Sequence, residues 1–160
     1  MTTPRIGHGY DVHAFTEGDG IVLGGVEIPC DKAIVAHSDG DVAIHALCDA
    51  LLGALGRGDI GHLFPDSDST NRDRNSREFL REVAGLMRDD GYVLANADLT
   101  LIAQTPRIGP HVDAMRQVLA GDLDCQVSQI NVKATTTEKL GFIGQEQGIA
   151  AEAVVLLGGR

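Results

Sequence analysis

The stretch DVAIHALCDALLGAL, residues 41–55, is apolar almost throughout, because after Asp41 only His45 and Asp49 carry polar side chains. Its apolar residues cover most of a helical circumference, and Ser38 or Asp41 can cap such a helix at its N-terminus. A helix that is apolar on most sides is mostly buried. The stretch therefore predicts a helix that ends near Leu55 and lies inside the fold.

The flanking sequence predicts strands and two further helices. Short alternating or β-rich runs predict strands over 6–15, 21–23, 26–28, 93–104, 130–134 and 149–157, with a hairpin around Gly24 and Gly25. Asn75 and Glu78 have capping-box spacing ahead of an amphipathic helix that Gly91 ends, and another helix is expected over 110–121. The polar residues 56–74 predict a long surface loop, a kind of segment that is usually functional or disordered.

These elements predict an α+β fold in two layers, with a mixed β-sheet covered by helices on one face. The other face of the sheet must then be buried by something else, and an oligomer is the simplest answer. A chain of 160 residues can bury one ordinary core, so we expect a single domain over residues 1–160.

The composition excludes several classes of protein. A formal net charge of -10 argues against a nucleic-acid backbone as partner, and no apolar run approaches the roughly 18 residues of a membrane span. Residues 1–10 lack a secretory pattern, so a cytoplasmic location is the default expectation. The three cysteines show neither a disulfide framework nor a thiolate zinc pattern, which makes them reduced packing residues. If an acidic chain of this kind handles phosphates, bound divalent cations are the obvious source of positive charge.

Three residues form a candidate metal site. Asp11 and His13 lie two apart on an expected strand, so their side chains point to the same side of the sheet. His45 lies on the buried helix, and Asp49 follows it by one turn, where its carboxylate can hold the imidazole in the correct tautomer. One carboxylate and two imidazoles suit zinc and leave a fourth tetrahedral position open for a substrate oxygen. Spacing alone also allows His45 to be a hydrogen-bonded core residue.

A second candidate is NVKATTTEKLG, residues 131–141, which places three hydroxyls, a lysine and a carboxylate where a strand ends. Hydroxyls and backbone amides at such a point can bind phosphate oxygens, and Glu138 can hold a hard cation between two phosphates. The same residues also fit a capped turn with solvated charges.

Six separated motifs occur in a characteristic order. They are RIGHGYDVHAF, LGGVEIP, AHSDGDVAIHALCDALLGAL, GDIGHLFPDSD, LIAQTPRIGPH and NVKATTTEKLGF. Together they closely resemble the 2-C-methyl-D-erythritol 2,4-cyclodiphosphate synthase family over residues 5–157. The resemblance implies a lyase of the non-mevalonate isoprenoid pathway, which converts 4-diphosphocytidyl-2-C-methyl-D-erythritol 2-phosphate to the cyclodiphosphate and releases CMP.

The resemblance also implies which residues do the chemistry. Zinc would lie on Asp11, His13 and His45, and magnesium or manganese on Glu138, while His37 and Thr136 would stabilise the transition state. The substrate's own 2-phosphate attacks the β-phosphorus, so the protein positions groups and neutralises charge. The substrate-binding residues that the resemblance implies are Val12, Ser38, Asp59, Ile60, Gly61, Phe64, Pro65, Asp66, Ser67 and Asp68 for the erythritol side, Ala103, Gln104, Thr105, Pro106, Arg107, Ile108 and Gly109 for cytosine, and Thr135 and Thr137 for the diphosphate.

The family assembles as a homotrimer whose sheets face a central axis, and the resemblance implies the same assembly here. The loop 103–109 of one subunit would complete the metal site of its neighbour. In the family, an arginine in a segment like GFTGRGEG binds isoprenoid diphosphates at an axial cavity, near the phenylalanine that matches Phe142. This chain has Gln145 in place of that arginine, so we expect weak isoprenoid binding.

Two alternative functions fit parts of the sequence. A zinc phosphohydrolase would use the same ligands but needs room for a metal-bound water as nucleophile. A trimeric module that only binds metal or isoprenoid diphosphate would leave Glu138 and the cytosine loop without a task. The products formed from the diphosphocytidyl substrate separate these three functions.

Overall fold

A five-stranded mixed sheet forms the centre of the protein, for which a computed structural model describes residues 3–160. Only β5 and β6 run parallel, and the other neighbours in the sheet are antiparallel. In spatial order the strands are β4 (Lys32–Ile34), β1 (Arg5–Glu17), β7 (Gly148–Gly159), β5 (Tyr92–Ile102) and β6 (Ile130–Thr135). The hairpin of β2 (Gly20–Leu23) and β3 (Val26–Pro29) forms a separate small sheet. The mixed α+β class predicted from the sequence is confirmed, while residues 1 and 2 of the expected single domain lie outside the described part.

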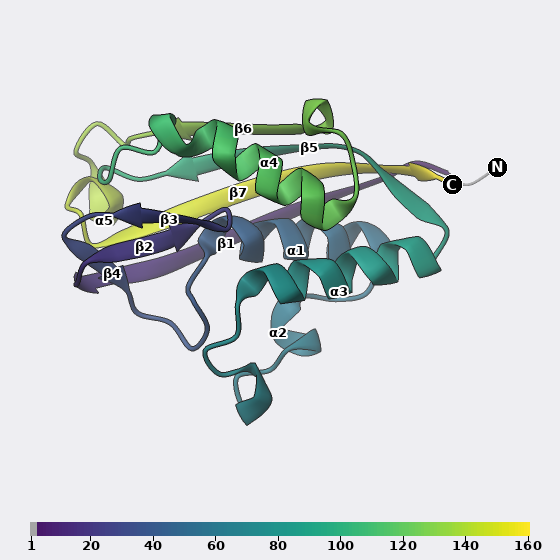
Figure 1. Ribbon diagram of the computed structural model, residues 1–160, viewed down its shortest axis with the longest axis horizontal. Coiled ribbons are helices and arrows are strands. Elements are labelled where there is room, and N and C mark those ends of the chain that lie inside the picture. The colour runs from purple at the N-terminus through teal and green to yellow at the C-terminus, as the bar shows by residue number, and fades with distance from the viewer. Residues whose placement is uncertain (1–2) are drawn as a thin grey trace.

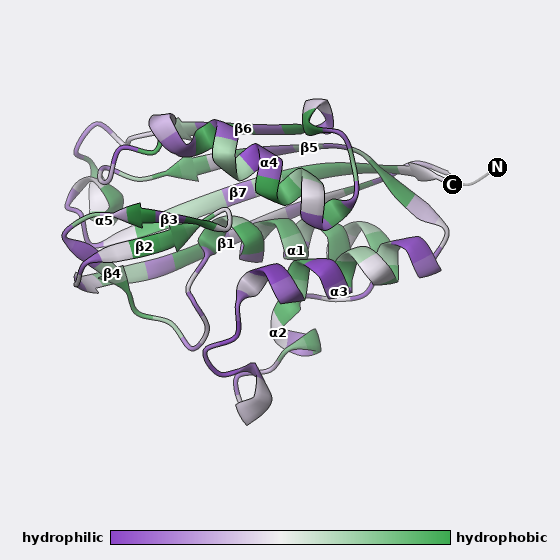
Figure 2. Ribbon diagram, viewed as in Figure 1, coloured by the Kyte–Doolittle hydropathy of each residue, from purple (hydrophilic) through white to green (hydrophobic). Residues whose placement is uncertain are grey.

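Three long helices cover one face of the sheet (Figure 1). They are α1 (Val42–Leu55), α3 (Ser76–Asp89) and α4 (Val112–Leu123). Figure 2 shows α1 as largely hydrophobic and α3 as amphipathic, which matches the burial of nearly every α1 side chain. Two short helices, α2 (Ile60–Leu63) and α5 (Gly141–Gly144), and three single 3₁₀ turns at 69–71, 109–111 and 127–129 complete the described chain. None of these helices is long and apolar enough to cross a membrane.

Helix α1 lies directly against the backbone of β1. A Cβ atom added to Gly7 would stand 1.8 Å from the carbonyl oxygen of Ala50, and one added to Gly9 would stand 1.8 Å from that of Ala46. Only glycine permits such an approach of helix to strand. The close contact brings the residues that follow on the same face of β1 next to α1.

The buried Asp41 holds the start of α1 to the β2–β3 hairpin. As the N-cap, its Oδ1 accepts hydrogen bonds from the backbone amides of Ile44 (3.0 Å) and Gly24 (2.9 Å), and its Oδ2 accepts one from Gly25 (2.7 Å). Of the two expected caps, Ser38 and Asp41, the structure selects Asp41. Burial raises the pKa of the Asp41 carboxyl to about 6, against the opposing effect of these amide donors.

The opposite face of the sheet carries an exposed apolar stripe, which we call the open face. Ile6 on β1 is 72% exposed and pairs with Leu156 on β7, which is 41% exposed. Tyr10, Val12 and Val154 extend the stripe along the same two strands. The stripe is interrupted by the exposed His8 and Glu152, which pair with Val154 and Tyr10. Exposed apolar side chains gathered in this way on adjacent strands can mark an interaction site.

The structure differs from the sequence prediction at three places. The alternation within 93–104 predicts Leu94 on the same face as Asn96 and Asp98, but a β-bulge between Leu94 and Asn96 shifts the pattern, and Leu94 is buried. Strand β4 and helix α5 have three and four residues, too short for a periodic signal. The loop 56–74 contains α2 and a 3₁₀ turn that begin at the side-chain caps Asp59 and Asp68.

Candidate metal centre and substrate pockets

Three donor atoms from β1 and α1 converge at one point. Asp11 Oδ2 lies 3.1 Å from His13 Nε2 and 3.1 Å from His45 Nδ1, and the two nitrogens lie 3.3 Å apart. Asp11 and His13 continue the β1 face on which Gly7 and Gly9 contact α1, so the close packing of helix on strand brings His45 to them. The structure therefore brings together the three residues that the sequence singled out as a metal site.

The electrostatics of the triangle favour an ionised carboxylate beside the imidazoles. Burial opposes ionisation of Asp11, but hydrogen bonds and charge from His13 and His45 outweigh it and lower the pKa of Asp11 to about 2. Burial likewise disfavours a charged His45, yet Asp11 outweighs it and raises the pKa of His45 above 6.5. The three side chains thus form one site that attracts a positive charge, either a proton or a metal ion.

The second ring nitrogen of His45 faces two hydroxyl groups. Its Nε2 lies 2.8 Å from Ser76 Oγ and 3.3 Å from Ser38 Oγ. This corrects the expected role of Asp49, because no hydrogen bond within residues 3–160 joins Asp49 to the ring. Its Oδ1 instead accepts from the backbone amide of Ile60 at 2.7 Å, which fixes the start of α2. The helical spacing was right, but the Asp49 carboxylate turns toward the loop.

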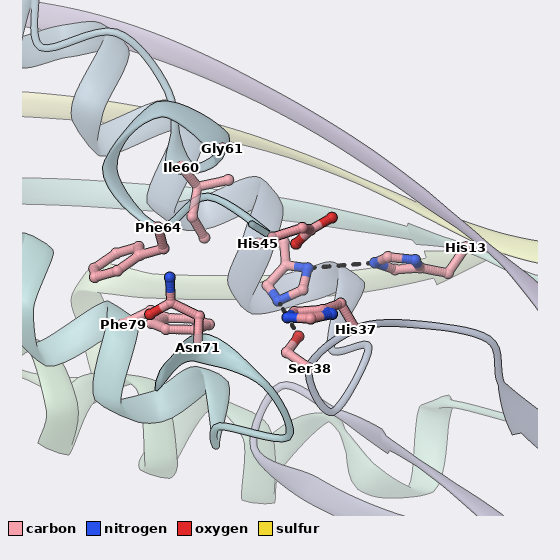
Figure 3. A pocket seen from close by; sticks show the side chains of 10 residues that line it. His13, His37, Ser38, His45, Ile60, Gly61, Phe64, Asn71 and Phe79 are labelled. Carbon is pink, nitrogen blue, oxygen red and sulfur yellow. Dashed lines mark hydrogen bonds between the residues drawn. The ribbon is translucent and has the colours of Figure 1, made fainter. Parts of the chain in front are cut away.

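A pocket of about 140 Å³ opens beside this centre. Figure 3 shows a ring nitrogen of His13 directed at a ring nitrogen of His45, with the two rings edge to face, Ser38 at the other side of the His45 ring and His37 next to it. The Nε2 of His37 is buried and has no hydrogen-bond partner within the described chain, so this group is available to a ligand. The residues lining the pocket are His13, His37, Ser38, His45, Ile60, Gly61, Phe64, Asp66, Asn71 and Phe79.

The apolar wall of the pocket is an aromatic pair that the sequence did not reveal. Phe64 stacks on Phe79 with ring centroids 4.4 Å apart, and the Arg74 guanidinium lies 4.6 Å from the Phe79 centroid. Asn71 is buried and its Nδ2 donates to the Pro65 carbonyl at 3.0 Å, which shapes the loop. Phe79 looked like an ordinary core residue of an amphipathic helix, so no sequence signal set it apart.

A second pocket, of about 240 Å³, lies at the C-terminal ends of β5 and β6. Lys139 donates its backbone amide to Gln104 Oε1 at 3.0 Å, which ties the loop after β6 to the loop after β5. This pocket shares no lining residue with the one beside the metal centre. Its lining residues are Ala103, Gln104, Pro106, Arg107, Ile108, Gly109, Ala134, Thr135 and Thr136.

The loop after β6 is exposed and tightly turned. Glu138 has φ +54°, donates its amide to Thr136 Oγ1 at 3.2 Å, and uses its carboxylate in no hydrogen bond or ion pair within residues 3–160. Thr137 donates its hydroxyl to the carbonyl of Leu140 at 2.6 Å. Phe142 is 45% exposed on α5, and Gln145 ends that helix.

Among the predicted binding residues, those that line neither pocket are Val12, Asp59, Pro65, Ser67, Asp68, Thr105, Thr137, Phe142 and Gln145. The Val12 side chain is on the open face, opposite Asp11 and His13. Asp59 caps α2 by accepting from the His62 amide at 2.7 Å, and Asp68 accepts from the Thr70 amide at 3.0 Å. Pro65 and Ser67 are exposed on the same loop. Within one chain, Val12 and the first pocket are separated by the sheet.

Comparison with known proteins gives consistent results. The model of the YgbB family matches residues 4–158. Two proteins named 2-C-methyl-D-erythritol 2,4-cyclodiphosphate synthase are similar to the chain: that of Mannheimia succiniciproducens is 59% identical and that of Ectopseudomonas mendocina is 60% identical. The alignments cover 96% of this chain and 96% and 98% of those proteins.

Solved structures agree with these matches. The bifunctional IspDF of Campylobacter jejuni superposes with a TM-score of 0.95 at 44% identity, covering 99% of this chain and 43% of that one. The CDP complex of IspF from Plasmodium falciparum has a TM-score of 0.87 at 39% identity, covering 98% and 97%.

Proposed function

The chain belongs to the YgbB family, and from this premise we propose that it is a cyclodiphosphate synthase. It converts 4-diphosphocytidyl-2-C-methyl-D-erythritol 2-phosphate to 2-C-methyl-D-erythritol 2,4-cyclodiphosphate and releases CMP, within the non-mevalonate isoprenoid pathway. Relatives that carry the synthase name match 96% of the chain at close to 60% identity, which supports transfer of the whole activity. We further propose that the chain acts as a single catalytic domain.

The observation that carries the proposal is the triangle of Asp11 Oδ2, His13 Nε2 and His45 Nδ1, with edges of 3.1, 3.1 and 3.3 Å. A tetrahedral zinc ion with bonds of about 2.0–2.1 Å holds its ligand atoms about 3.3 Å apart. The donor set and its spacing therefore fit zinc. When bound, the ion would polarise a phosphate oxygen of the substrate.

The side chains around the triangle suit a substrate that carries its own nucleophile. An oxygen of the 2-phosphate attacks the β-phosphorus, a new P–O bond forms, and the bond to the CMP oxygen breaks. His37 Nε2 and the Ser38 hydroxyl line the pocket and can donate hydrogen bonds to phosphate oxygens. Ile60 and Phe64 offer an apolar wall to the erythritol carbons and exclude water.

A second divalent cation, magnesium or manganese, would be held by Glu138. Glu138 lies on an exposed turn where its backbone amide donates to Thr136 Oγ1, and its carboxylate makes no hydrogen bond or ion pair within the described residues. Hard cations prefer such oxygen ligands. In this proposal, Thr136 and His37 stabilise the charge that develops on the transferred phosphoryl group.

The active site is proposed to form between subunits of a homotrimer. As the family resemblance implies, the loop 103–109 of one subunit would complete the metal pocket of the next. The two pockets share no lining residue within one chain, which is compatible with that arrangement. The open face would be buried around the threefold axis, as closed cyclic assembly allows. A relative of known structure binds CDP, which supports a cytidine nucleotide as the ligand of the second pocket.

Product analysis tests the function. The purified protein is incubated with the diphosphocytidyl substrate, zinc and magnesium, and the products are followed by phosphorus NMR. Stoichiometric cyclodiphosphate and CMP are expected, and chelation of the metals should stop both. CMP with a linear phosphate product would indicate a phosphohydrolase instead, and absence of CMP would indicate a binding module.

A further inference from the structure

The hydroxyl of Ser76 lies at the end of a polar chain that starts at the metal triangle. Ser76 is the first residue of α3, is fully buried, and places its Oγ 2.8 Å from His45 Nε2. The Ser38 hydroxyl is the other neighbour of this nitrogen, but it is 3.3 Å away and lines the open pocket. Ser76 is therefore the shorter and better shielded partner of His45.

Asp39 determines which way the Ser76 hydroxyl points. Its Oδ2 accepts from the Ser76 backbone amide at 2.9 Å, and its Oδ1 contacts Ser76 Oγ and accepts from the Asp41 amide at 3.1 Å. An ionised carboxylate can only accept hydrogen bonds. Ser76 must then donate its hydroxyl hydrogen to Asp39, which leaves an oxygen lone pair directed at His45.

A lone pair at this position selects one tautomer of His45. Neutral imidazole carries a single N–H, and Ser76 accepts it only when the hydrogen is on Nε2. The Nδ1 lone pair is then free to bind a metal ion. The competing tautomer carries its hydrogen on Nδ1 and would donate it to Asp11 Oδ2, 3.1 Å away, which blocks two ligand positions at once.

We propose that Ser76, oriented by Asp39, is a positioning residue that holds His45 in the tautomer required for metal binding. The inference rests on the proposed metal site and extends it to residues that are distant in sequence. Ser76 is 31 positions from His45 and 37 positions from Asp39. This series of hydrogen bonds also links the start of α3 to α1. The loop between these helices lines the substrate pocket, so it is anchored to the metal ligand at its far end.

The test measures metal binding rather than turnover. Zinc affinity is determined by competition with a chromophoric chelator for the wild type and for Ser76→Ala, Ser76→Thr, Asp39→Asn and Ser38→Ala, each checked for its fold by circular dichroism. Loss of an outer partner of a metal-bound histidine typically lowers affinity about 10–100-fold. We expect that loss for Ser76→Ala, a loss in the same direction for Asp39→Asn, and a smaller one for Ser38→Ala.

Two readouts separate positioning from a structural role. Ser76→Thr keeps the hydroxyl and should restore most of the affinity. The visible spectrum of bound cobalt(II), which reports ligand geometry, should change in Ser76→Ala and match the wild type in Ser76→Thr. If Ser76→Ala does not fold, Asp39→Asn decides the question by the same measurements.

The outcomes distinguish this inference from the function on which it rests. Wild-type protein that binds no zinc would contradict the proposed metal site itself. Wild-type protein that binds zinc, together with Ser76→Ala and Asp39→Asn that bind it equally tightly and with unchanged cobalt spectra, would overturn only the role of Ser76.

Discussion

The carbonyl oxygen of Ala46 occupies the space that a Cβ atom on Gly9 would require, with only 1.8 Å between the two positions. Ala46 follows the metal-site residue His45, and Gly9 precedes Asp11 on the same face of β1. The separation of helix and strand is therefore set one residue from His45 on the helix and two residues from Asp11 on the strand. The absence of a side chain at Gly9 thus controls the distance between the donor atoms on β1 and the donor atom on α1.

Gly9→Ala should both destabilise the protein and weaken zinc binding. The added methyl meets backbone, which cannot move aside as a side chain can, so a loss of about 2–3 kcal/mol in unfolding free energy is expected. Gly85→Ala is the matched control, because nothing lies within 4 Å of its added Cβ on α3, and there alanine should stabilise by up to about 1 kcal/mol. Denaturant unfolding and zinc titration measure both effects, and a Gly9→Ala protein with wild-type values would refute the packing argument.

Asp41→Asn should remove a pH dependence of stability. Because burial raises the folded-state pKa of Asp41 from 3.8 to about 6, its ionisation costs no stability below about pH 4, and the cost is complete above about pH 6. The unfolding free energy of the wild type should therefore fall relative to the variant across this window, by up to about 3 kcal/mol.

The absolute stability of Asp41→Asn should still be lower than that of the wild type. The NH₂ group that replaces Oδ2 cannot accept from the Gly25 amide, although the remaining carbonyl oxygen can still accept from the amides of Gly24 and Ile44. Two donors then face each other, and leaving them unpaired costs stability. Urea unfolding at a series of pH values gives the difference curve. A flat difference between pH 4 and pH 6 would show that the Asp41 carboxyl does not titrate there.

Much of the fold follows from periodicity and caps in the sequence. The apolar run 42–55 and the capping residue Asn75 predict α1 and α3 because these signals are local, while the sequence left Ser38 and Asp41 open as the cap of α1. The bulge at Leu94 is not local, since it depends on how β5 pairs with β7. Pairing of this kind carries no signature in the alternation of one strand.

The candidate site likewise combines residues that the sequence alone predicts with residues that only tertiary packing brings together. Asp11, His13 and His45 have chemistry that suggests a metal site, and their convergence matches that expectation. Ser76 and Asp39 reach His45 only through tertiary packing, and a serine at a helix start ordinarily signals a cap. Helical spacing favoured Asp49 as the partner of His45, but the backbone of Ile60 competes for its carboxylate and cannot be seen from a helical wheel.

Glu138→Gln should remove the increase in turnover that magnesium or manganese gives, without lowering the zinc content of the protein. The glutamine keeps the size of the side chain but loses the charge that a hard cation needs. Turnover as a function of magnesium concentration should become flat, while zinc content by mass spectrometry stays at the wild-type level. Parallel loss of both metals would contradict two separate sites.

Val154→Asp should prevent assembly of the proposed trimer. Val154 is 40% exposed on the open face, and burying a carboxylate around an axis without a partner is costly. Val127→Asp is the control, because Val127 is 39% exposed on a 3₁₀ turn outside the open face. Light scattering should give three times 16.9 kDa for the wild type and the control, and less for Val154→Asp. A fully active wild-type monomer would refute the assembly.

Gln145→Arg should strengthen binding of isoprenoid diphosphates and leave turnover in their absence nearly unchanged. The Gln145 amide donates to the Lys139 carbonyl at 3.4 Å and brings no charge, whereas charge-assisted contacts to phosphate are roughly twice as strong as neutral ones. Calorimetry with farnesyl diphosphate should detect weak or no binding to the wild type. Tight, salt-sensitive binding by the unmodified protein would show that another residue supplies the charge.

The triangle of Asp11, His13 and His45 is held by a strand and a helix that the hydrophobic core already fixes in place. We therefore expect metal uptake to be uncoupled from folding, unlike the case of small zinc domains that unfold when the ion is removed. On this expectation, the metal-free protein would stay folded and could exchange ions without passing through a denatured state. Because copper(II) competes strongly for such nitrogen and oxygen ligands, affinity alone would not select zinc, and the geometry of the site together with cellular supply would decide which metal occupies it.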